Sequence, residues 1–378
     1  MSFEHLNLGE SLLRTLRDEG FETPTPIQLK AIPKILQGYD LLASAQTGTG
    51  KTAAYLLPIL CRMLRPSSHP HKKGPRVLIL APTRELAMQV AQESTKFARY
   101  LSKVKTVCIY GGAPYPVQIR ELSRPYEILV ATPGRLIDHL QRGRVDLSRC
   151  EVLILDEADR MLDMGFIRPV EEIASLTPKT RQTLLFSATL KGSVLKLAKN
   201  LLNQPVEIRV DQERAKHENI EQRLYRVDSL KHKEHLLEHL LSSLDKSQAI
   251  VFTSTKRHAD QLSSKLKARG FSAAAMHGDM DQRARSRTLT SLREGHLQIL
   301  VATDVAARGI DVENIGYVIN FNLPMSGEDY VHRIGRTGRA GKTGVAFSLV
   351  APGDTSILRQ IEKFTGQKIT PHTPVLCK

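Results

Sequence analysis

The strongest sign of chemistry in this sequence is a phosphate-binding pattern at residues 45–52, Ala-Gln-Thr-Gly-Thr-Gly-Lys-Thr. An apolar run before it predicts a buried strand at Leu41–Ala43, and Ala53–Leu57 behind it predicts the start of a helix. The two glycines let the backbone curl so that its N–H groups point at a polyphosphate, and the helix start adds the positive end of a dipole. We therefore expect Lys51 to reach the β- and γ-phosphates of a nucleotide and the Thr52 hydroxyl to ligate Mg²⁺.

An acidic pair, Asp156 and Glu157, follows the apolar run Val152–Leu155, which predicts a buried strand. A carboxylate at the end of such a strand can hold Mg²⁺, usually through water, opposite the Thr52 hydroxyl. The neighbouring Glu157 can then orient and deprotonate an attacking water. An acidic pair at a strand end can also be a plain helix cap, but the phosphate-binding pattern in the same domain favours the Mg²⁺ and water roles.

The densest basic motif is His332–Arg339, which contains four cationic or imidazole side chains and two glycines. A solvated basic face is the simplest interpretation of such a run. The spacing of Arg336 and Arg339 also suits two guanidinium groups that converge on a γ-phosphate, as arginine fingers do. If these fingers and the phosphate loop lie on different domains, hydrolysis requires the domains to close on one nucleotide.

Short apolar runs alternate with helical patterns along the whole chain, which predicts an α/β fold of mostly parallel sheets covered by helices on both faces. A length of 378 residues suggests about two domains. We place them at 1–210 and 220–378, joined by a linker at 211–219, because residues 204–219 are polar and charged. The predicted strands centre on residues 41–43, 77–80, 107–109, 128–130, 152–155 and 183–186, and then on 249–252, 273–276, 299–301, 317–319 and 345–347.

Polar clusters follow strand after strand at the same end, where ligands of parallel sheets bind. In one of them, Thr132 is expected to cap a helix whose first residue is Pro133. A single cluster of this kind could be an ordinary cap. Several at the same end of successive strands would line one rim of one sheet.

A net charge of +15 favours a polyanionic partner, with nucleic acid first, although a merely basic protein is the alternative. Aromatic residues make up only 5% and tryptophan is absent, which argues against base stacking and favours recognition of the sugar-phosphate backbone. The four cysteines are scattered without a CxxC pair, as in reduced cytosolic proteins. No leader pattern and no apolar window of about 18 residues is present, so we expect a cytoplasmic protein without a membrane segment.

Taken in order, these motifs resemble those of the DEAD-box ATP-dependent RNA helicases, superfamily 2 motors with two tandem RecA-like domains. Residues 156–159 spell the family's name, and the likeness covers essentially the whole chain with a dozen motifs. It implies ATP and Mg²⁺ as cofactors, and it implies that Ala45, where a common phosphate loop has glycine, is normal for this branch. The likeness is to the bacterial RhlE-like branch in particular.

The resemblance assigns roles to individual residues, motif by motif. The nucleotide-binding set comprises Phe3, Phe21, Thr23 and Gln28 of the adenine-selecting Q motif, the loop residues Ala45, Gln46, Thr47, Gly48, Thr49, Gly50, Lys51 and Thr52, and also Gly309 and Asp311. Hydrolysis is assigned to Lys51, Asp156, Glu157, Arg336 and Arg339, and its coupling to duplex opening to Ser187, Thr189 and His332. Contacts to the RNA backbone are assigned to Pro82, Thr83, Arg84, Gly111, Gly112, Thr132, Pro133, Gly134, Arg135, Thr253, Ser254, Gln282, Arg285, Thr303 and Asp304.

The implied function is ATP-dependent local unwinding of short RNA duplexes and remodelling of RNA–protein complexes, with ribosomal or RNA-decay assemblies as the expected partners. RNA would be bound as a single strand or short duplex with little sequence preference, and the 2′-OH would distinguish it from DNA. The alternative is an ATP-gated RNA clamp that nucleates an assembly, which would show slow phosphate release and long RNA residence. A DNA motor would instead respond equally to single-stranded DNA.

Overall fold

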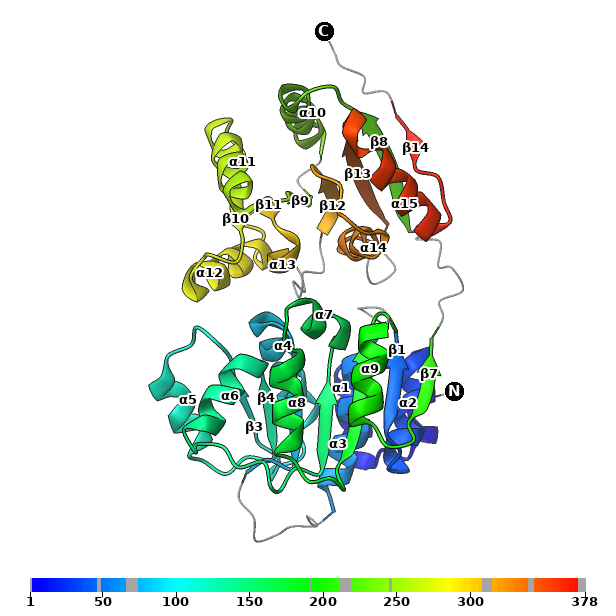
Figure 1. Cartoon of the computed structure of the whole chain (residues 1–378), viewed down its shortest axis with the longest axis vertical. Helices are drawn as coiled ribbons and strands as arrows, with labels where there is room; N and C mark the ends of the chain where they lie inside the picture. The colour runs from blue at the N-terminus through cyan, green and yellow to red at the C-terminus, as the bar shows by residue number, and fades with distance from the viewer. Residues whose placement is uncertain are drawn as a thin grey trace. The chain divides into compact units, whose positions relative to one another are not determined.

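The computed structural model of the protein describes residues 2–45, 49–65, 74–190, 192–210, 219–244, 247–307, 315–338 and 343–372, with the backbone alone at Gln282 and Val305. The chain divides into two compact units, Met1–Asp211 and Gln212–Lys378, and each is described by itself (Figure 1). We call them unit 1 and unit 2. The predicted linker, 211–219, lies outside the described residues except for Asn219.

Unit 1 is built on a sheet of seven parallel strands in the order β3-β4-β2-β5-β6-β1-β7. The strands are β1 (Leu41–Ser44), β2 (Val77–Leu80), β3 (Thr106–Ile109), β4 (Ile128–Ala131), β5 (Val152–Leu155), β6 (Gln182–Ser187) and β7 (Val206–Arg209). The six strands predicted here are confirmed. The edge strand β7 was missed because only Ile208 of its four residues is buried, so its sequence lacks an apolar run.

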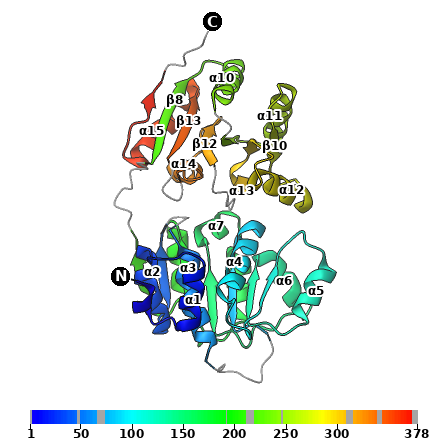
Figure 2. The ribbon, with the colours of Figure 1, turned by 180° about the vertical axis from the view of Figure 1, so that it is seen from behind.

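Helices cover both faces of this sheet, as predicted. They are α1 (Glu10–Asp18), α2 (Pro26–Leu36), α3 (Lys51–Met63), α4 (Arg84–Phe97), α5 (Tyr115–Leu122), α6 (Pro133–Gln141), α7 (Ala158–Asp163), α8 (Ile167–Ser175) and α9 (Gly192–Leu201), after a 3-10 turn at Phe3–Leu6. Alternate side chains of each strand enter opposite cores. Val77 and Ile79 of β2 pack with α1 to α4, whereas Leu78 and Leu80 pack with α6 to α9. Figures 1 and 2 show these two layers from opposite sides.

Unit 2 repeats this plan with seven parallel strands in the order β10-β11-β9-β12-β13-β8-β14. The strands are β8 (Ile220–Arg226), β9 (Gln248–Phe252), β10 (Ala273–Met276), β11 (Ile299–Ala302), β12 (Ile315–Asn320), β13 (Gly344–Val350) and β14 (Thr370–Pro371). The helices are α10 (Leu230–Ser243), α11 (Lys256–Ala268), α12 (Gln282–Arg293), α13 (Asp304–Ala307), α14 (Gly327–Ile334) and α15 (Thr355–Thr365), with a 3-10 turn at Pro352–Asp354. The five predicted strands, β9 to β13, are confirmed, whereas the edge strand β14 and its neighbour β8 were not predicted.

The two cores of unit 2 again lie on opposite faces of the sheet. Ala249 and Val251 of β9 pack with α10 and α11, whereas Ile250 and Phe252 pack with α12 to α15. Among the helices of the described ranges, none combines the length and the apolar character that a bilayer crossing requires.

A buried glutamine begins one central strand in each unit. Gln182, the first residue of β6, donates through Nε2 to the carbonyl oxygen of Ile35 in the last turn of α2 at 3.2 Å. Gln248, the first residue of β9, donates through Nε2 to the carbonyl oxygens of Leu292 and, at 2.9 Å, Leu297. The carbonyl oxygens of Ile35 and Leu292 also accept from the backbone N–H groups of Gly38 at 3.0 Å and Gly295 at 3.2 Å. Each glutamine is therefore an additional, side-chain donor that ties the start of a strand to the end of a helix.

We expect Gln248→Ala to lower the free energy of unfolding by about 1–3 kcal/mol, because the buried carbonyl oxygen of Leu297 loses this donor and that of Leu292 keeps only its backbone donor. The measurement is urea denaturation of the full chain, followed by circular dichroism. Gln261→Ala, at an exposed position of α11, is the matched control and should change the unfolding free energy by less than about 0.5 kcal/mol. Equal effects of the two substitutions would contradict this role for Gln248.

Candidate active site

The described part of the phosphate loop turns into α3 at Gly50, which has a φ of 86°. Two features favour glycine at this position. The backbone is left-handed, and a Cβ would lie 2.5 Å from Nε2 of Gln28. The next residue, Lys51, is 6% exposed, and its ammonium has no hydrogen-bond acceptor among the described residues. A buried ammonium is costly unless it is paired, so this loop is arranged to receive an anion. Residues 46–48 lie outside the described residues.

The Q motif lies directly against this loop. Gln28 accepts through Oε1 from the backbone N–H of Thr25, the N-cap residue of α2, at 2.9 Å. It also donates through Nε2 to the carbonyl oxygen of Gly50 at 3.2 Å. One donor and one acceptor position of the amide remain for an adenine edge. Thr23 is exposed, whereas Phe3 is buried in the core and Phe21 packs edge-on against Phe97.

Asp156 follows β5 and is 2% exposed. Its Oδ2 accepts from the hydroxyl of Tyr55 at 2.8 Å, and its Oδ1 accepts from the backbone N–H of Glu157 at 2.9 Å. Burial raises the pKa of the Asp156 carboxyl, and the nearby positive charge of Lys51 opposes that rise. The fold therefore brings Lys51 and Asp156 together, as predicted for a nucleotide with its metal.

Tyr55 was not predicted as part of the site. Its ring is fully buried, and its hydroxyl interacts with both Asp156 and Thr52. Burial and the Asp156 charge raise the pKa of this phenol well above its usual value, so it remains a donor. Its position one helical turn after Lys51 is the signal that could have indicated it, because residues three or four apart share a face of α3.

Glu157 has strained backbone, with a φ of 51° at the residue that precedes α7. A non-glycine residue in the left-handed region costs free energy, and such residues cluster at functional sites. Its carboxylate pairs with the guanidinium of Arg160 in the first turn of α7, and both side chains are buried. Arg160 was not predicted, and its spacing of three residues from Glu157 is its only sequence signal.

The motif at Ser187–Thr189 is tied to the same acidic loop by Asp159. The Asp159 carboxylate accepts from the backbone N–H groups of Ala188 at 3.1 Å and Thr189 at 2.9 Å, and from the Thr189 hydroxyl at 3.2 Å. In return, the backbone N–H of Asp159 donates to the Ser187 hydroxyl at 3.3 Å. These hydrogen bonds fix the acidic loop and the loop at Ser187–Thr189 relative to each other.

Two predicted RNA motifs of unit 1 meet through Arg84. A Cβ at Gly112 would lie 2.3 Å from the guanidinium of Arg84, and the φ of Gly112 is 86°. Gly111 lies against the same guanidinium. Thr83 begins α4 and accepts through its hydroxyl from the backbone N–H of Leu86 at 3.3 Å, while Pro82 before it is buried. The two glycines thus make room for the arginine.

A third motif joins this rim through Arg135. Thr132 occupies the N-cap position of α6 and Pro133 is the first residue of the helix, as predicted, although the Thr132 side chain makes no capping hydrogen bond. Arg135 donates to the carbonyl oxygen of Ala113 at 3.0 Å, and its guanidinium lies 4.2 Å from the centre of the Tyr115 ring. Gly134, in the first turn of α6, is exposed.

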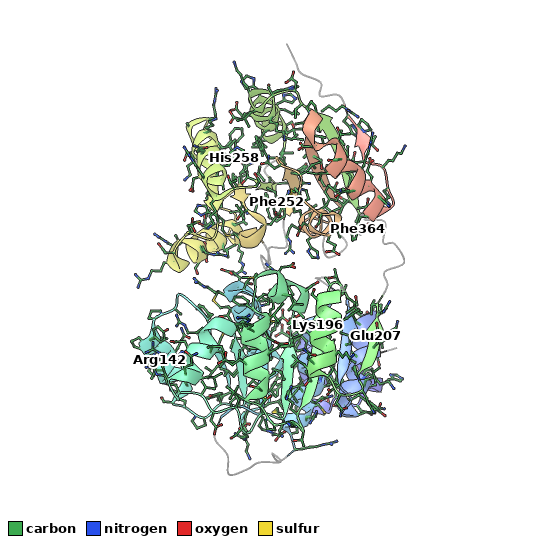
Figure 3. The ribbon with its side chains drawn as sticks, in the orientation of Figure 1. Arg142, Lys196, Glu207, Phe252, His258 and Phe364 are labelled. Atoms are coloured by element: carbon green, nitrogen blue, oxygen red, sulfur yellow. The ribbon has the colours of Figure 1, made fainter. Side chains whose placement is uncertain are left out.

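In unit 2, Asp304 is held by a residue that was not predicted. Arg333 donates to both carboxylate oxygens of Asp304, at 2.6 and 2.7 Å, and to Oδ1 of Asn320 at 3.1 Å. Its guanidinium lies 4.9 Å from the ring centre of Phe252, the last residue of β9 (Figure 3). Asp304, His332, Arg333 and Arg336 line one small pocket together with Phe252. In this structure Asp304 positions α14.

The remaining predicted residues of unit 2 are placed as follows. Arg336 is 7% exposed and donates through Nε to the carbonyl oxygen of His332 at 3.1 Å. Thr253 and Thr303 are buried at the ends of β9 and β11, Ser254 is exposed, and Arg285 is buried on α12. Three predicted residues, Gly309, Asp311 and Arg339, lie outside the described residues, as does the side chain of Gln282.

Comparison with known proteins identifies the family. The family model "DEAD/DEAH box helicase" matches residues 25–197, and the model "Helicase conserved C-terminal domain" matches residues 231–341. The DEAD-box ATP-dependent RNA helicase CshA of Bacillus cereus is 44% identical over 368 residues, which cover 97% of this chain and 69% of that protein. The chain belongs to the DEAD-box RNA helicase family.

Other members of the family support the same fold. The ATP-dependent RNA helicase DeaD of Mycobacterium tuberculosis is 46% identical over 369 residues, 98% of this chain but only 64% of that protein. This chain thus spans less than two thirds of the length of that relative. S. cerevisiae Dbp5 bound to RNA and ADP BeF3 is 31% identical with a TM-score of 0.88 and covers 98% of this chain and 94% of its own. Mss116p bound to ssRNA and AMP-PNP is 29% identical with a TM-score of 0.89, and the match covers 99% of this chain and 80% of that protein's chain. Both support two tandem RecA-like units.

We expect Asp156→Asn to raise the free energy of unfolding at pH 7 by more than at pH 4. The pKa of Asp156 is raised in the folded state above its ordinary value of 3.8. Wild-type stability is therefore lost as the pH rises from about 3.8 through the folded pKa, and the amide does not carry this cost. Urea denaturation at several pH values measures the difference between variant and wild type.

The exposed Asp163 on α7 provides the matched control. Asp163→Asn should give a difference from the wild type that varies little with pH. If Asp156→Asn stabilised the protein equally at pH 4 and pH 7, the buried carboxylate would not be the cause.

Proposed function

We propose that this chain is an ATP-dependent RNA helicase that couples ATP binding and hydrolysis to local unwinding of short RNA duplexes and to remodelling of RNA–protein complexes. The observation that carries the proposal is the buried Lys51 ammonium, without an acceptor among the described residues, beside Asp156 at the end of β5. The names of the family members at 44–46% identity favour a helicase over an ATP-gated clamp.

The site fits a triphosphate with Mg²⁺. Lys51 would bind the phosphates, and Asp156 and Thr52, both in contact with the Tyr55 hydroxyl, would hold the metal. Among the described residues there is no group of three or more His, Cys, Asp or Glu side chains suited to a metal, so phosphate oxygens and waters would complete the shell. When bound, Mg²⁺ would neutralise charge that develops on the phosphates.

For hydrolysis, we assign Glu157 to orienting the attacking water and accepting its proton. Arg160, paired with this carboxylate, fixes its direction. Asp159 would transmit a change at the acidic loop to Ser187 and Thr189, and thus to RNA. Arg336 would supply positive charge to the γ-phosphate. Arg339, together with Gly309 and Asp311 as nucleotide contacts, is proposed from the family resemblance.

For RNA, we assign the rim formed by Arg84, Arg135 and the glycines at 111 and 112 to contacts with the phosphate backbone. Its guanidinium groups are held by backbone and aromatic contacts, which suits recognition of phosphates without sequence preference. Solved relatives are bound to RNA, which supports RNA as the ligand of this chain. The cytoplasmic setting, the RhlE-like branch, and ribosomal or RNA-decay assemblies as partners remain proposals from the sequence.

The test of this function is Glu157→Gln in the full chain. We expect ATP and single-stranded RNA to bind with nearly unchanged affinity, while RNA-stimulated phosphate release falls by about 10²-fold or more, because the amide cannot accept a proton. Phosphate release and strand separation of a short RNA duplex are measured together. Glu172→Gln, at an exposed position of α8, is the control and should keep wild-type turnover. Unchanged turnover in Glu157→Gln would remove Glu157 from its role, and equal stimulation by single-stranded DNA would contradict an RNA helicase.

We also expect Gly112→Ala to weaken binding of single-stranded RNA by about tenfold, because the new Cβ displaces the Arg84 guanidinium from its place. Fluorescence anisotropy with a labelled RNA and a non-hydrolysed ATP analogue measures the affinity. Gly143→Ala is a closely matched control, since Gly143 also has a positive φ, +64°, but nothing lies within 4 Å of the position that a Cβ would take there. If Gly112→Ala and Gly143→Ala weakened RNA binding to the same extent, backbone strain and not displacement of Arg84 would be the cause.

A further inference from the structure

A cavity of about 680 Å³ opens at the amino-terminal edge of the unit 1 sheet. It is lined by residues that precede β1, β5, β6 and β7 and by the end of α3, including Asp40, Glu151, Arg181 and Asn203. The candidate active site lies at the other end of the same strands. β1 alone, four residues long, separates the two edges by about 13 Å at 3.3 Å per residue.

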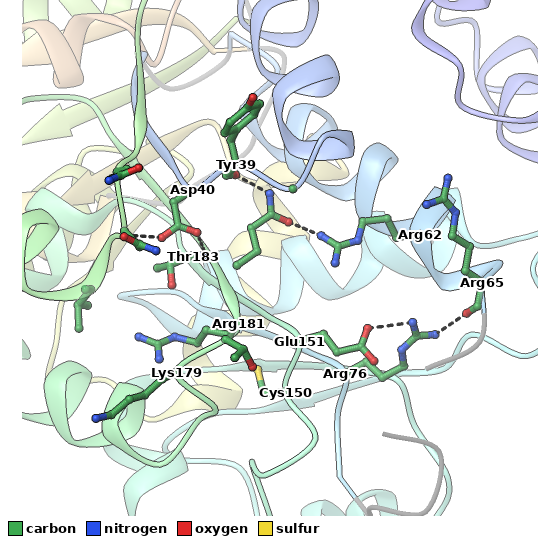
Figure 4. A pocket seen from close by; sticks show the side chains of 16 residues that line it. Tyr39, Asp40, Arg62, Arg65, Arg76, Cys150, Glu151, Lys179, Arg181 and Thr183 are labelled. Carbon is green, nitrogen blue, oxygen red and sulfur yellow. Dashed lines mark hydrogen bonds and ion pairs between the residues drawn. The ribbon is translucent and has the colours of Figure 1, made fainter. Parts of the chain in front are cut away.

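Five cationic side chains line this cavity, and Figure 4 shows Arg62, Arg65 and Arg76 on one side with Lys179 and Arg181 on the other. Only two carboxylates, those of Asp40 and Glu151, line it as well. The cavity therefore carries an excess of positive charge, unlike a cavity lined by structural ion pairs.

Both carboxylates are already bound within the protein. Asp40 accepts from the backbone N–H groups of Thr183 at 2.7 Å and Asn203 at 2.6 Å. Glu151 forms a buried ion pair with Arg76 at 2.9 Å. Their charges still act on the cavity, since Asp40 favours the charged form of Arg181 and Glu151 favours that of Arg62. Two carboxylates nevertheless cannot balance the charge of five cations.

Four cations of this lining lack a described carboxylate within ion-pair distance, namely Arg62, Arg65, Lys179 and Arg181. Arg181 donates through Nη1 only to the carbonyl oxygen of Pro178, and its Nε is buried without an acceptor among the described residues. Burial lowers the pKa of the Arg181 and Arg62 guanidinium groups, and the nearby Asp40 and Glu151 carboxylates oppose this lowering only in part. A bound anion would relieve this imbalance.

We propose that this cavity is a second anion site, separate from the nucleotide site, that binds a small ligand with two or more phosphate groups between Arg181 and Lys179 on one side and Arg62 and Arg65 on the other. Guanidinium groups bind phosphate oxygens through paired donors, and the volume lies in the range of small-molecule sites. The half-exposed ring of Tyr39 lies at the same cavity and offers an apolar surface to the rest of such a ligand.

The test uses inorganic tripolyphosphate as the probe and the full chain with Lys51→Ala, which weakens the competing phosphate loop. Isothermal titration calorimetry at low ionic strength should show one site. Lys179→Ala and Arg181→Ala, each added to that background, should weaken binding by about tenfold, because each removes a charged donor. The wild-type chain saturated with a non-hydrolysed ATP analogue should still bind the probe.

Lys103→Ala is the matched control, since Lys103 is an exposed lysine of unit 1 outside the cavity. It should leave the affinity unchanged within about twofold. Lys179 is exposed, so its substitution should not disturb folding, and circular dichroism checks this for each variant. In addition, tripolyphosphate should protect Lys179, but not Lys103, from acetylation measured by mass spectrometry.

Absence of binding in the Lys51→Ala background would overturn the proposal. Equal weakening by Lys103→Ala and Lys179→Ala would also overturn it, because the attraction would then be general to the basic surface. Protection of Lys179 by single-stranded RNA but not by tripolyphosphate would show that the cavity binds RNA and not a small phosphate ligand, which would also overturn the proposal. None of these results depends on whether the chain unwinds RNA.

Discussion

The buried charges of Lys51 and Asp156 are the constraint on which unit 1 depends. They come from different segments, the start of α3 and the end of β5, and Tyr55 joins both segments through Thr52 and Asp156. Burial makes each charge expensive, and the attraction between them offsets only part of that cost. The charge of a phosphate group and its metal would supply the remaining compensation, so this part of the fold is shaped around a polyphosphate.

The same site holds other unfavourable features. Glu157 has a left-handed backbone, and its carboxylate is paired with Arg160 in a buried place. Proteins retain strain and buried charge where function needs side chains fixed in advance. In the proposed function, fixed groups of this kind would help the site to distinguish ATP from its products, since little reorganisation is left for the moment of reaction.

Motifs far apart in the sequence are linked by single side chains. Gln28 connects the Q motif to Gly50, Asp159 connects the acidic loop to residues 187–189, and Arg84 lies against the glycines at 111 and 112. In unit 2, Arg333 plays this part by holding Asp304. Each link is a hydrogen bond or close contact with defined geometry, so it fixes the position of one motif relative to the next.

The sequence by itself determined the central strands, the α/β class and the motifs, because buried parallel strands require continuous apolar runs and phosphate loops require glycine before lysine. It also predicted the helix start at Thr132 and Pro133. The edge strands β7 and β14, together with β8 beside β14, were not predicted, because their sequences lack continuous apolar runs. Only the tertiary structure decided the roles of Tyr55, Arg160 and Arg333 and the existence of the cationic cavity. Those depend on distances between segments that no local pattern encodes.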